Sequence, residues 1–225
     1  MMRVLVAFEC SGVVREAFRA RGFDCFSADL KAAEDGSASH LRGDVFGPGG
    51  ALEAKVWDLV IAHPPCTYLS SSGLHWNSRI PGREQKTVDA LQMVRKLMEW
   101  AIHSGKPFAM ENPVGCINTS LPELTSFFNF YIIQPYQFGD DASKRTCIWS
   151  LRLPRLIGTK LFPSRKVEWP VGTGRIVDRW GNQTDSGQNR LGPSDHRAAD
   201  RARTYPGIAN AMADQWGNFL RCVKK

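Results

Sequence analysis

Two residues of the sequence have the types and settings needed for covalent chemistry on a ring. Cys66 follows His63-Pro64-Pro65, whose prolines stiffen the backbone directly after an apolar run. Glu111 lies in Met110-Glu111-Asn112-Pro113, again a polar group after an apolar run. A firmly held thiol suits a nucleophile where positive charge lowers its pKa, and a partly desolvated carboxyl can exchange protons near neutral pH. The alternatives are a packed loop cysteine and a structural glutamate with a backbone partner.

A second group of residues is suited to hold a nucleoside. Phe8-Glu9-Cys10-Ser11-Gly12 is a small-residue turn that leads into a short helix, so a ligand can approach its backbone close to the positive helix N-terminus. The turn lacks a full GxGxxG, which disfavours a phosphate-cradling dinucleotide site. Asp29 follows a second apolar run and can accept hydrogen bonds from ribose hydroxyls, and Asp44 can receive an adenine amino group. An ordinary turn and surface or capping aspartates are the alternatives.

A thiol, a carboxylic acid and a nucleoside-type pocket together define one reaction. C5 of cytosine is not nucleophilic enough to attack an alkyl donor unaided, but a thiolate that adds at C6 makes C5 enamine-like. An acid at N3 stabilises the charge that develops on the ring. C5 can then take a methyl group from S-adenosylmethionine, and loss of the C5 proton with elimination of the thiol restores the ring.

Apolar runs and helical spacing predict the elements that must position these residues. Strands are expected at residues 3–8, 23–28, 56–62 and 107–110, with further candidates at 130–134 and 146–151. Helices are expected after Ser11, from about Pro206, and over 84–103, where apolar residues recur at helical spacing: Val88, Leu91, Val94, Leu97, Met98 and Ala101.

This alternation of strands and helices predicts an α/β fold with a mostly parallel, Rossmann-like sheet. In such a sheet, ligands bind beyond the carboxyl ends of the strands. Glu9-Cys10, Asp29, the stretch from His63 to Cys66, and Glu111 all follow predicted strands. The sequence therefore predicts one shared site at this edge of the sheet.

The ordered set of motifs resembles the DNA cytosine-5 methyltransferases. The turn from Phe8 to Gly12 is similar to the family's first, cofactor-binding motif, with Cys10 in place of one glycine. The other matching segments are Asp29-Leu30, Gly43-Asp44-Val45, the catalytic loop with Pro65-Cys66, Ser70, Ser72 and Gly73, the ENV-like Glu111-Asn112-Pro113, and the stretch from Ile208 to Met212. The matches run from residue 3 to about 222 and leave only 150–204 unmatched. The chain looks most like the short members carried by phages and prophages.

The resemblance implies a fold, a cofactor and site residues. The fold is the Rossmann-like sheet of the S-adenosylmethionine-dependent methyltransferases, and S-adenosyl-L-methionine is the expected cofactor. Cys66 is implied as the nucleophile, Glu111 as the partner of cytosine N3, and Arg145 as a further catalytic residue. The implied cofactor-binding residues are Phe8, Glu9, Cys10, Ser11, Gly12, Asp29, Leu30, Asp44, Val45, Pro65, Asn210 and Ala211.

Two departures from the family pattern bear on the substrate. The family's QxRxR motif, which supports the catalytic loop and the flipped base, is represented only by Ser143-Lys144-Arg145-Thr146-Cys147. Arg145 matches the first arginine, whereas Cys147 stands at the second, which puts contacts to the target base in doubt. The interval between this motif and the last one is about 55 residues, where larger members have a whole domain.

Positive charge is concentrated in that interval. The net charge is +7, yet residues 1–149 hold 15 Lys and Arg against 16 Asp and Glu, whereas residues 150–204 hold 11 against 5. We therefore expect a catalytic domain at 1–149 and 205–225, and a small basic target-recognition region at 150–204 that contacts DNA. Trp169 and Trp180 in that region stack on bases or form the core of a small subdomain. The expected DNA-binding residues are Ser70, Ser72, Lys144, Arg165, Lys166, Arg175 and Arg179.

Composition excludes several other classes of protein. No apolar run approaches the roughly 18 residues that span a bilayer, and the N-terminus lacks a signal-peptide pattern, so a cytoplasmic protein is expected. The six cysteines form no CxxC pair and complete no zinc-like spacing with the histidines, so we expect reduced thiols and no metal. A monomer, which a cognate restriction enzyme can accompany in the cell, is the expected state.

Two alternatives to DNA cytosine methylation stay open. One is a catalytically weak nucleic-acid-binding relative that keeps the fold, suggested by the altered QxRxR segment, although such a protein needs neither Cys66 nor Glu111. The other is the same chemistry on RNA, single-stranded DNA or another pyrimidine, which the small recognition region permits.

Overall fold

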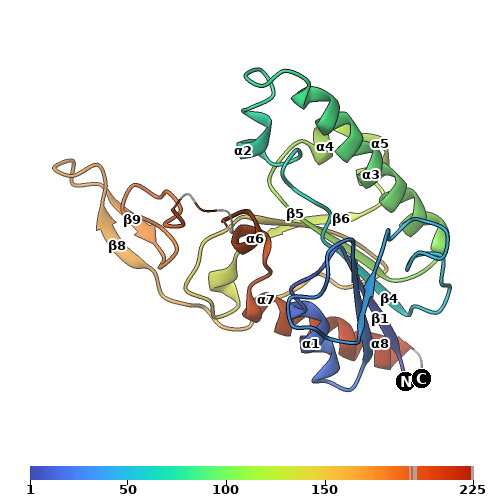
Figure 1. Cartoon of the computed structure of the whole chain (residues 1–225). Coiled ribbons are helices and arrows are strands. Elements are labelled where there is room, and N and C mark those ends of the chain that lie inside the picture. Colours follow the sequence, from blue (N-terminus) through green and yellow to red (C-terminus); the bar gives the residue numbers. More distant parts are fainter. Residues whose placement is uncertain (193, 195–196, 224–225) are drawn as a thin grey trace.

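A seven-stranded sheet forms the centre of the molecule (Figure 1). The computed structural model describes residues 1–192, 194 and 197–223. The strand order is β3-β2-β1-β4-β5-β7-β6, and β7 alone runs antiparallel to its neighbours within this sheet of the described residues. The strands are β1 (Arg3–Ala7), β2 (Asp24–Asp29), β3 (His40–Arg42), β4 (Leu59–Ala62), β5 (Phe108–Pro113), β6 (Asn129–Ile133) and β7 (Thr146–Leu151).

Helices cover both faces of this sheet because its central strands are apolar on both sides. In β1, Val4 and Val6 pack on one face, whereas Leu5 and Ala7 pack on the other, as the alternation of side chains in a strand requires. The first face is covered by α1 (Val13–Arg19), α7 (Pro206–Ala211), a π-helical turn η2 (Met212–Trp216) and α8 (Gly217–Val223). The second face is covered by α3 (Arg83–Ser104), α4 (Ile117–Ser120) and α5 (Pro122–Thr125).

The predicted fold class is confirmed, with local differences. Helix α3 matches the predicted 84–103, but Val88, expected on its buried face, is 45% exposed because the buried apolar residues of α3 begin only at Val94. The predicted single C-terminal helix is instead α7 and α8 joined by the π-helical turn. Trp216 in that turn is fully buried, and its indole N–H donates to the carbonyl of Pro154 (2.9 Å).

An antiparallel hairpin of β8 (Arg165–Glu168) and β9 (Ile176–Arg179) projects away from the sheet (Figure 1). It was not predicted, because the sequence shows no sustained periodicity there. The predicted boundary at residue 150 falls inside β7, and Leu153 and Leu156 still belong to the main core. Short helices complete the chain: α2 (Ser71–Leu74), η1 (Pro135–Gln137) and α6 (Arg197–Ala202).

Candidate active site

The loop after β4 holds Cys66 at the carboxyl edge of the sheet. The backbone N–H of His63 donates to the carbonyl of Ala7 (2.9 Å), which continues the parallel pairing of β4 with β1 by one residue. Beyond the two prolines, the Cys66 carbonyl accepts from the backbone N–H groups of Leu69 (3.1 Å) and Ser70 (2.9 Å). Burial raises the pKa of the Cys66 thiol, the charge of Glu111 raises it further, and the charge of Lys144 lowers it. The thiol is therefore protonated at rest.

Glu111 lies on β5, the strand next to β4, and is buried. Its Oε2 is 3.2 Å from Nδ1 of His63, and both side chains are about nine-tenths buried. Burial acts to raise the pKa of Glu111, but the hydrogen bond with His63 and the charge of Lys144 outweigh it, so this pKa lies below its usual range. The resting site thus pairs a protonated thiol with an ionised carboxylate.

A second contact ties β5 to the same loop. The side-chain amide of Asn112 donates to the carbonyl of Pro64 (2.8 Å). Two buried atoms beside these contacts, Nε2 of His63 and Oδ1 of Asn112, have no hydrogen-bond partner among the described residues. The contact of His63 with Glu111 was not predicted from the sequence. Its position directly after a predicted strand could have indicated a site residue.

A cavity of about 520 Å³ opens in front of Cys66. Three of the expected DNA-binding residues line it: Ser70, Ser72 and Lys144. Several further lining residues were not predicted as site residues, among them Trp76, Arg83, Asn182, Gln183, Asn189, Asp200, Arg201 and Tyr205. One part of the lining therefore comes from the Cys66 loop, and another combines carboxamide, basic and acidic side chains.

The segment before β7 places Lys144 and Arg145 differently. Lys144 lines the cavity, and its Nζ donates to the carbonyl of Arg201 (2.9 Å). Arg145 is exposed and does not line the cavity. Ser143 and Lys144 both line the cavity, so the lining from this segment ends at Lys144. The structure thus does not bring Arg145, an expected catalytic residue, to Cys66 and Glu111.

Glu9 caps helix α1 from within the turn after β1. Its Oε1 accepts from the backbone N–H of Val14 (2.8 Å) and its Oε2 from that of Arg15 (3.2 Å), while Ser11 Oγ donates to Oε1 (3.3 Å). Since this carboxylate already occupies the positive end of the helix, a second anion such as a phosphate is disfavoured there. The geometry agrees with the absence of a phosphate-binding glycine motif.

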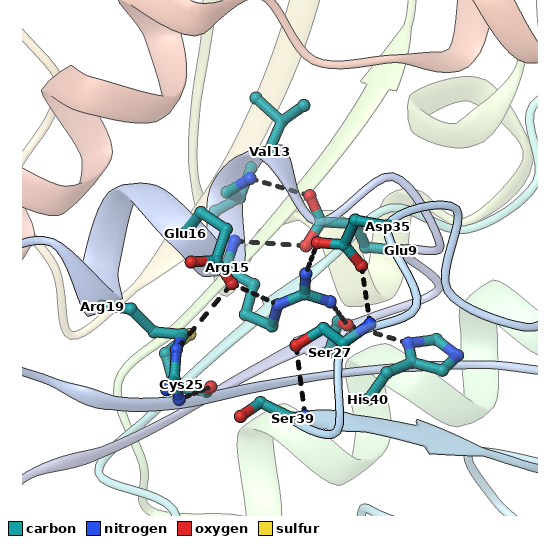
Figure 2. Close-up of polar contacts among 12 residues, drawn as sticks. Glu9, Val13, Arg15, Glu16, Arg19, Cys25, Ser27, Asp35, Ser39 and His40 are labelled. Atoms are coloured by element: carbon teal, nitrogen blue, oxygen red, sulfur yellow. Dashed lines mark hydrogen bonds and ion pairs between the residues drawn. The ribbon is translucent and has the colours of Figure 1, made fainter.

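A buried arginine supports the same turn (Figure 2). Arg15 has no exposed surface, and its guanidinium forms an ion pair with Asp35 and donates to Ser27 Oγ (2.7 Å). Gly12 has a φ of +74°, and a Cβ there would lie 2.3 Å from Nη2 of Arg15. The left-handed backbone therefore favours glycine here, and a side chain would also displace the Arg15 guanidinium. The long, charged arginine gave no sequence signal of burial.

Acidic groups gather around Cys10 in that turn. The Cys10 carbonyl accepts from the backbone N–H of Glu34 (2.9 Å), and its thiol donates to Oε1 of Glu34 (3.6 Å). Burial raises the pKa of Cys10, and the charges of Asp29 and Glu34 raise it further. Asp29 itself accepts from the backbone N–H of Lys31 (2.8 Å) through Oδ1. Glu34 also forms an ion pair with Arg203, and the charge of Lys31 lowers the pKa of Cys10, so the negative charge of this turn is partly compensated.

The remaining expected cofactor residues divide into two groups. Asp44, which is exposed, and Val45, which is buried, border a cavity of about 640 Å³ next to the end of β2. The Phe8 ring lies 5.9 Å from that of Phe46, so the turns after β1 and β3 are in contact. Leu30 and Pro65 are exposed near the same edge.

Asn210 and Ala211 lie elsewhere. The side chain of Asn210 accepts from Arg21 (3.1 Å), which follows the C-terminal end of α1, and Ala211 is buried in the core. Because α1 starts at the Gly12 turn, its C-terminal end lies away from that turn. The structure does not bring Asn210 together with the other expected cofactor residues.

The expected basic residues of the projecting region are exposed or half-buried and mostly paired. Arg165 forms an ion pair with Asp185, and Lys166 with Asp178, while Arg179 donates to the Asp185 carbonyl. Arg175 is exposed, and its side chain has no partner within the described part of the chain. In contrast, Arg152 donates to carbonyls at the end of α3 and Arg155 lies over the Tyr131 ring. Arg152 and Arg155 therefore stabilise the fold.

Across residues 1–192, 194 and 197–223, no cluster of three or more His, Cys, Asp or Glu side chains could hold a metal ion. Over the same residues, every helix is too short or too polar to traverse a lipid bilayer.

The sequence matches no protein-family model and no curated protein. Solved structures with a similar backbone include an E. coli prophage protein described as a DNA modification methyltransferase (15% identity, TM-score 0.46, 73% of this chain and 53% of that chain). A DNMT2 variant from Spodoptera frugiperda has 15% identity and a TM-score of 0.42 over 72% of this chain and 54% of that one. The METTL16 methyltransferase domain has 9% identity and a TM-score of 0.40 over 67% and 74%.

This chain thus spans about half the length of the first two of these proteins. At such identities and TM-scores, the similarities assign neither a substrate nor a reaction to it.

Proposed function

We propose that the chain transfers a methyl group from S-adenosylmethionine to C5 of cytosine in DNA. The observation that carries this proposal is the placement of Cys66 and Glu111. Cys66 follows β4, Glu111 lies on the adjacent strand β5, the charge of Glu111 raises the pKa of Cys66, and Cys66 lines a cavity. A nucleophile that lines a cavity, with a carboxyl on the neighbouring strand, suits addition to a pyrimidine ring.

The turn after β1 fits S-adenosylmethionine. This cofactor carries positive charge at its sulfonium and amino groups and has no phosphate, in agreement with the carboxylates around Cys10 and the capped N-terminus of α1. Asp29 would bind the ribose, and Asp44 with Val45 the adenine, next to the Phe8–Phe46 contact. When bound, the cofactor supplies an electrophilic methyl group.

The side chains of this chain then have defined tasks. The Cys66 sulfur forms a bond to C6 of cytosine as the thiol loses its proton, and N3 of the ring gains one. Glu111 is ionised at rest and lies close enough to act on the Cys66 thiol, so it is suited to accept that proton and to donate it at N3. After C5 is methylated, the C5 proton leaves to solvent, the S–C6 bond breaks, and the N3 proton returns through Glu111 to the Cys66 sulfur.

DNA reaches this cavity only if the target base leaves the stack. Gln183 and Asn189 offer amide groups to a base edge, whereas the Asn182 amide binds the backbone of Ser143. The exposed Arg175 of the projecting region, whose side chain is unpaired among the described residues, can bind a phosphate. The altered QxRxR segment, with Arg145 outside the cavity, favours the binding-only alternative. A monomeric state, a restriction partner and a cytoplasmic location stay predictions.

Transfer of labelled methyl groups tests the proposal. The protein is incubated with methyl-labelled S-adenosylmethionine and duplex DNA, single-stranded DNA or RNA, and the products are digested and separated as nucleosides. We expect 5-methylcytosine from duplex DNA, a loss of transfer in Cys66→Ser, and full transfer in Cys222→Ser, an exposed cysteine on α8. Label on an exocyclic amino group, or in Cys66→Ser, would sink the mechanism. Binding of DNA without any label would support the binding-only alternative.

A further inference from the structure

The position of His63 suits it to hold the side chain of Glu111. Its ring is nine-tenths buried, and its contact with Oε2 of Glu111 is the one hydrogen bond that the ring makes among the described residues, since Nε2 has no partner there. An ionised carboxylate only accepts hydrogen bonds, so the hydrogen is assigned to Nδ1 of His63. Among the described residues, the His63 ring therefore forms a hydrogen bond with Glu111 and with no other group.

The contact also selects which Glu111 oxygen is available. Oε2 is engaged by His63, whereas Oε1 has no hydrogen-bond partner within the described part of the chain. A carboxylate held by one oxygen cannot rotate freely, so the other oxygen keeps one direction. A carboxyl oxygen held in one direction suits proton transfer to N3 of cytosine, because small misplacements of a proton-transfer group slow the reaction strongly.

The charged and titratable groups around Glu111 are few. His63 and Cys66 come from the loop after β4, and Lys144 and Cys147 come from the segment leading into β7. Burial, and then the Glu111 charge, raises the pKa of Cys147 to about 11, so that thiol stays neutral. Of these four groups, His63 and Lys144 lower the pKa of Glu111, which burial raises. Without His63, Lys144 alone among the four would lower it.

We propose that His63 is a positioning residue that holds Glu111 as a carboxylate, with Oε1 free for the substrate base. This inference rests on the proposed function, because Glu111 is taken to act at the base. It adds a residue that the family resemblance does not supply. The Asn112–Pro64 contact independently joins β5 to the same loop, so the loop is expected to keep its position when His63 is replaced.

The test compares His63→Ala with His63→Asn, whose side-chain amide can replace the Nδ1 donor. With the wild type as reference, kcat, both KM values and the pH dependence of methyl transfer are measured. We expect kcat to fall about 10- to 100-fold in His63→Ala, with both KM values within about twofold. The acid limb of the pH profile is expected to move to higher pH, since burial of the carboxyl is then opposed less. His63→Asn is expected to recover most of kcat.

A second measurement does not depend on activity. The carboxyl carbons of glutamate are labelled with carbon-13 and titrated by NMR, with Glu111→Gln used to assign the Glu111 signal. We expect the Glu111 midpoint to rise in His63→Ala and to rise less in His63→Asn. An unmoved midpoint, or an unchanged kcat and pH profile in His63→Ala, would overturn the inference. If the wild type transfers no methyl group while the midpoint moves as expected, the proposed function fails and the pairing stands.

Discussion

The indole ring of Trp180 stacks on the phenol ring of Tyr136, with centroids 4.1 Å apart and planes inclined by 10°. Tyr136 lies in η1, directly after β6, and Trp180 directly follows β9, so the contact fastens the projecting hairpin to the sheet. The Trp180 N–H donates to the carbonyl of Phe162 (3.3 Å). The two tryptophans of the region therefore differ: Trp180 packs, whereas Trp169 is 37% exposed at the hairpin.

Replacing Trp180 is expected to loosen the projecting region and leave the turn after β1 intact. For Trp180→Ala we expect a loss of about 2 kcal/mol in unfolding free energy, roughly half of what a fully buried tryptophan loses, and weaker DNA binding. Urea unfolding and a DNA-binding titration measure the two effects. Trp169→Ala is the matched control, with a stability change within about 0.5 kcal/mol. Equal effects in both variants would contradict the assigned packing role.

Removing the charge of Glu111 is expected to make Cys66 more reactive and yet stop catalysis. The Glu111 carboxylate raises the pKa of Cys66, so Glu111→Gln lowers that pKa and increases the thiolate fraction at any pH below it. We expect several-fold faster alkylation of Cys66 by iodoacetamide at pH 8, followed by peptide mass spectrometry, with methyl transfer lost. Cys222, exposed on α8, reports any general change in thiol reactivity. Slower alkylation of Cys66 would show that the two groups are not coupled in this way.

Lys144 and Arg145 allow the family resemblance to be tested against the geometry. The resemblance assigns a catalytic role to Arg145, but Lys144 lines the cavity and its charge lowers the pKa of both Cys66 and Glu111. We expect Lys144→Ala to reduce methyl transfer about 10-fold or more, and Arg145→Ala to have a much smaller effect. Steady-state rates on one DNA substrate decide between them. The opposite ranking would restore the role that the resemblance gives to Arg145.

Sequence patterns were sufficient for the parts of the fold that are locally encoded. The apolar runs predicted β1, β2, β4 and β5 because buried parallel strands are continuous in hydrophobicity, and helical spacing predicted α3 to within one residue at each end. The β8–β9 hairpin was missed because its strands are short, polar and poorly buried.

The contacts among the candidate site residues could not be predicted from the motifs. His63 and Glu111 are 48 residues apart, and no local pattern pairs them. Lys144 lines the cavity and its neighbour Arg145 does not, a difference of one position that a motif match does not resolve. Asn210 matches the asparagine of the family's last motif, yet the packing of α7 on α1 directs its side chain to Arg21.

The Arg15–Asp35 ion pair gives the last prediction. Arg15 is fully buried, so Asp35→Ala leaves part of its guanidinium without a partner, and we expect a loss of about 1–3 kcal/mol in unfolding free energy. Glu34, the neighbour of Asp35, bonds to the Cys10 carbonyl, so a loosened segment also weakens binding of S-adenosylmethionine, measured by calorimetry. Glu123→Ala, which breaks the exposed pair with Arg95, is the matched control and is expected to cost less than about 1 kcal/mol. Asp35→Asn keeps a hydrogen-bond acceptor and is expected to fall between the wild type and Asp35→Ala. If Asp35→Ala is no more destabilising than Glu123→Ala, the buried arginine does not depend on this partner.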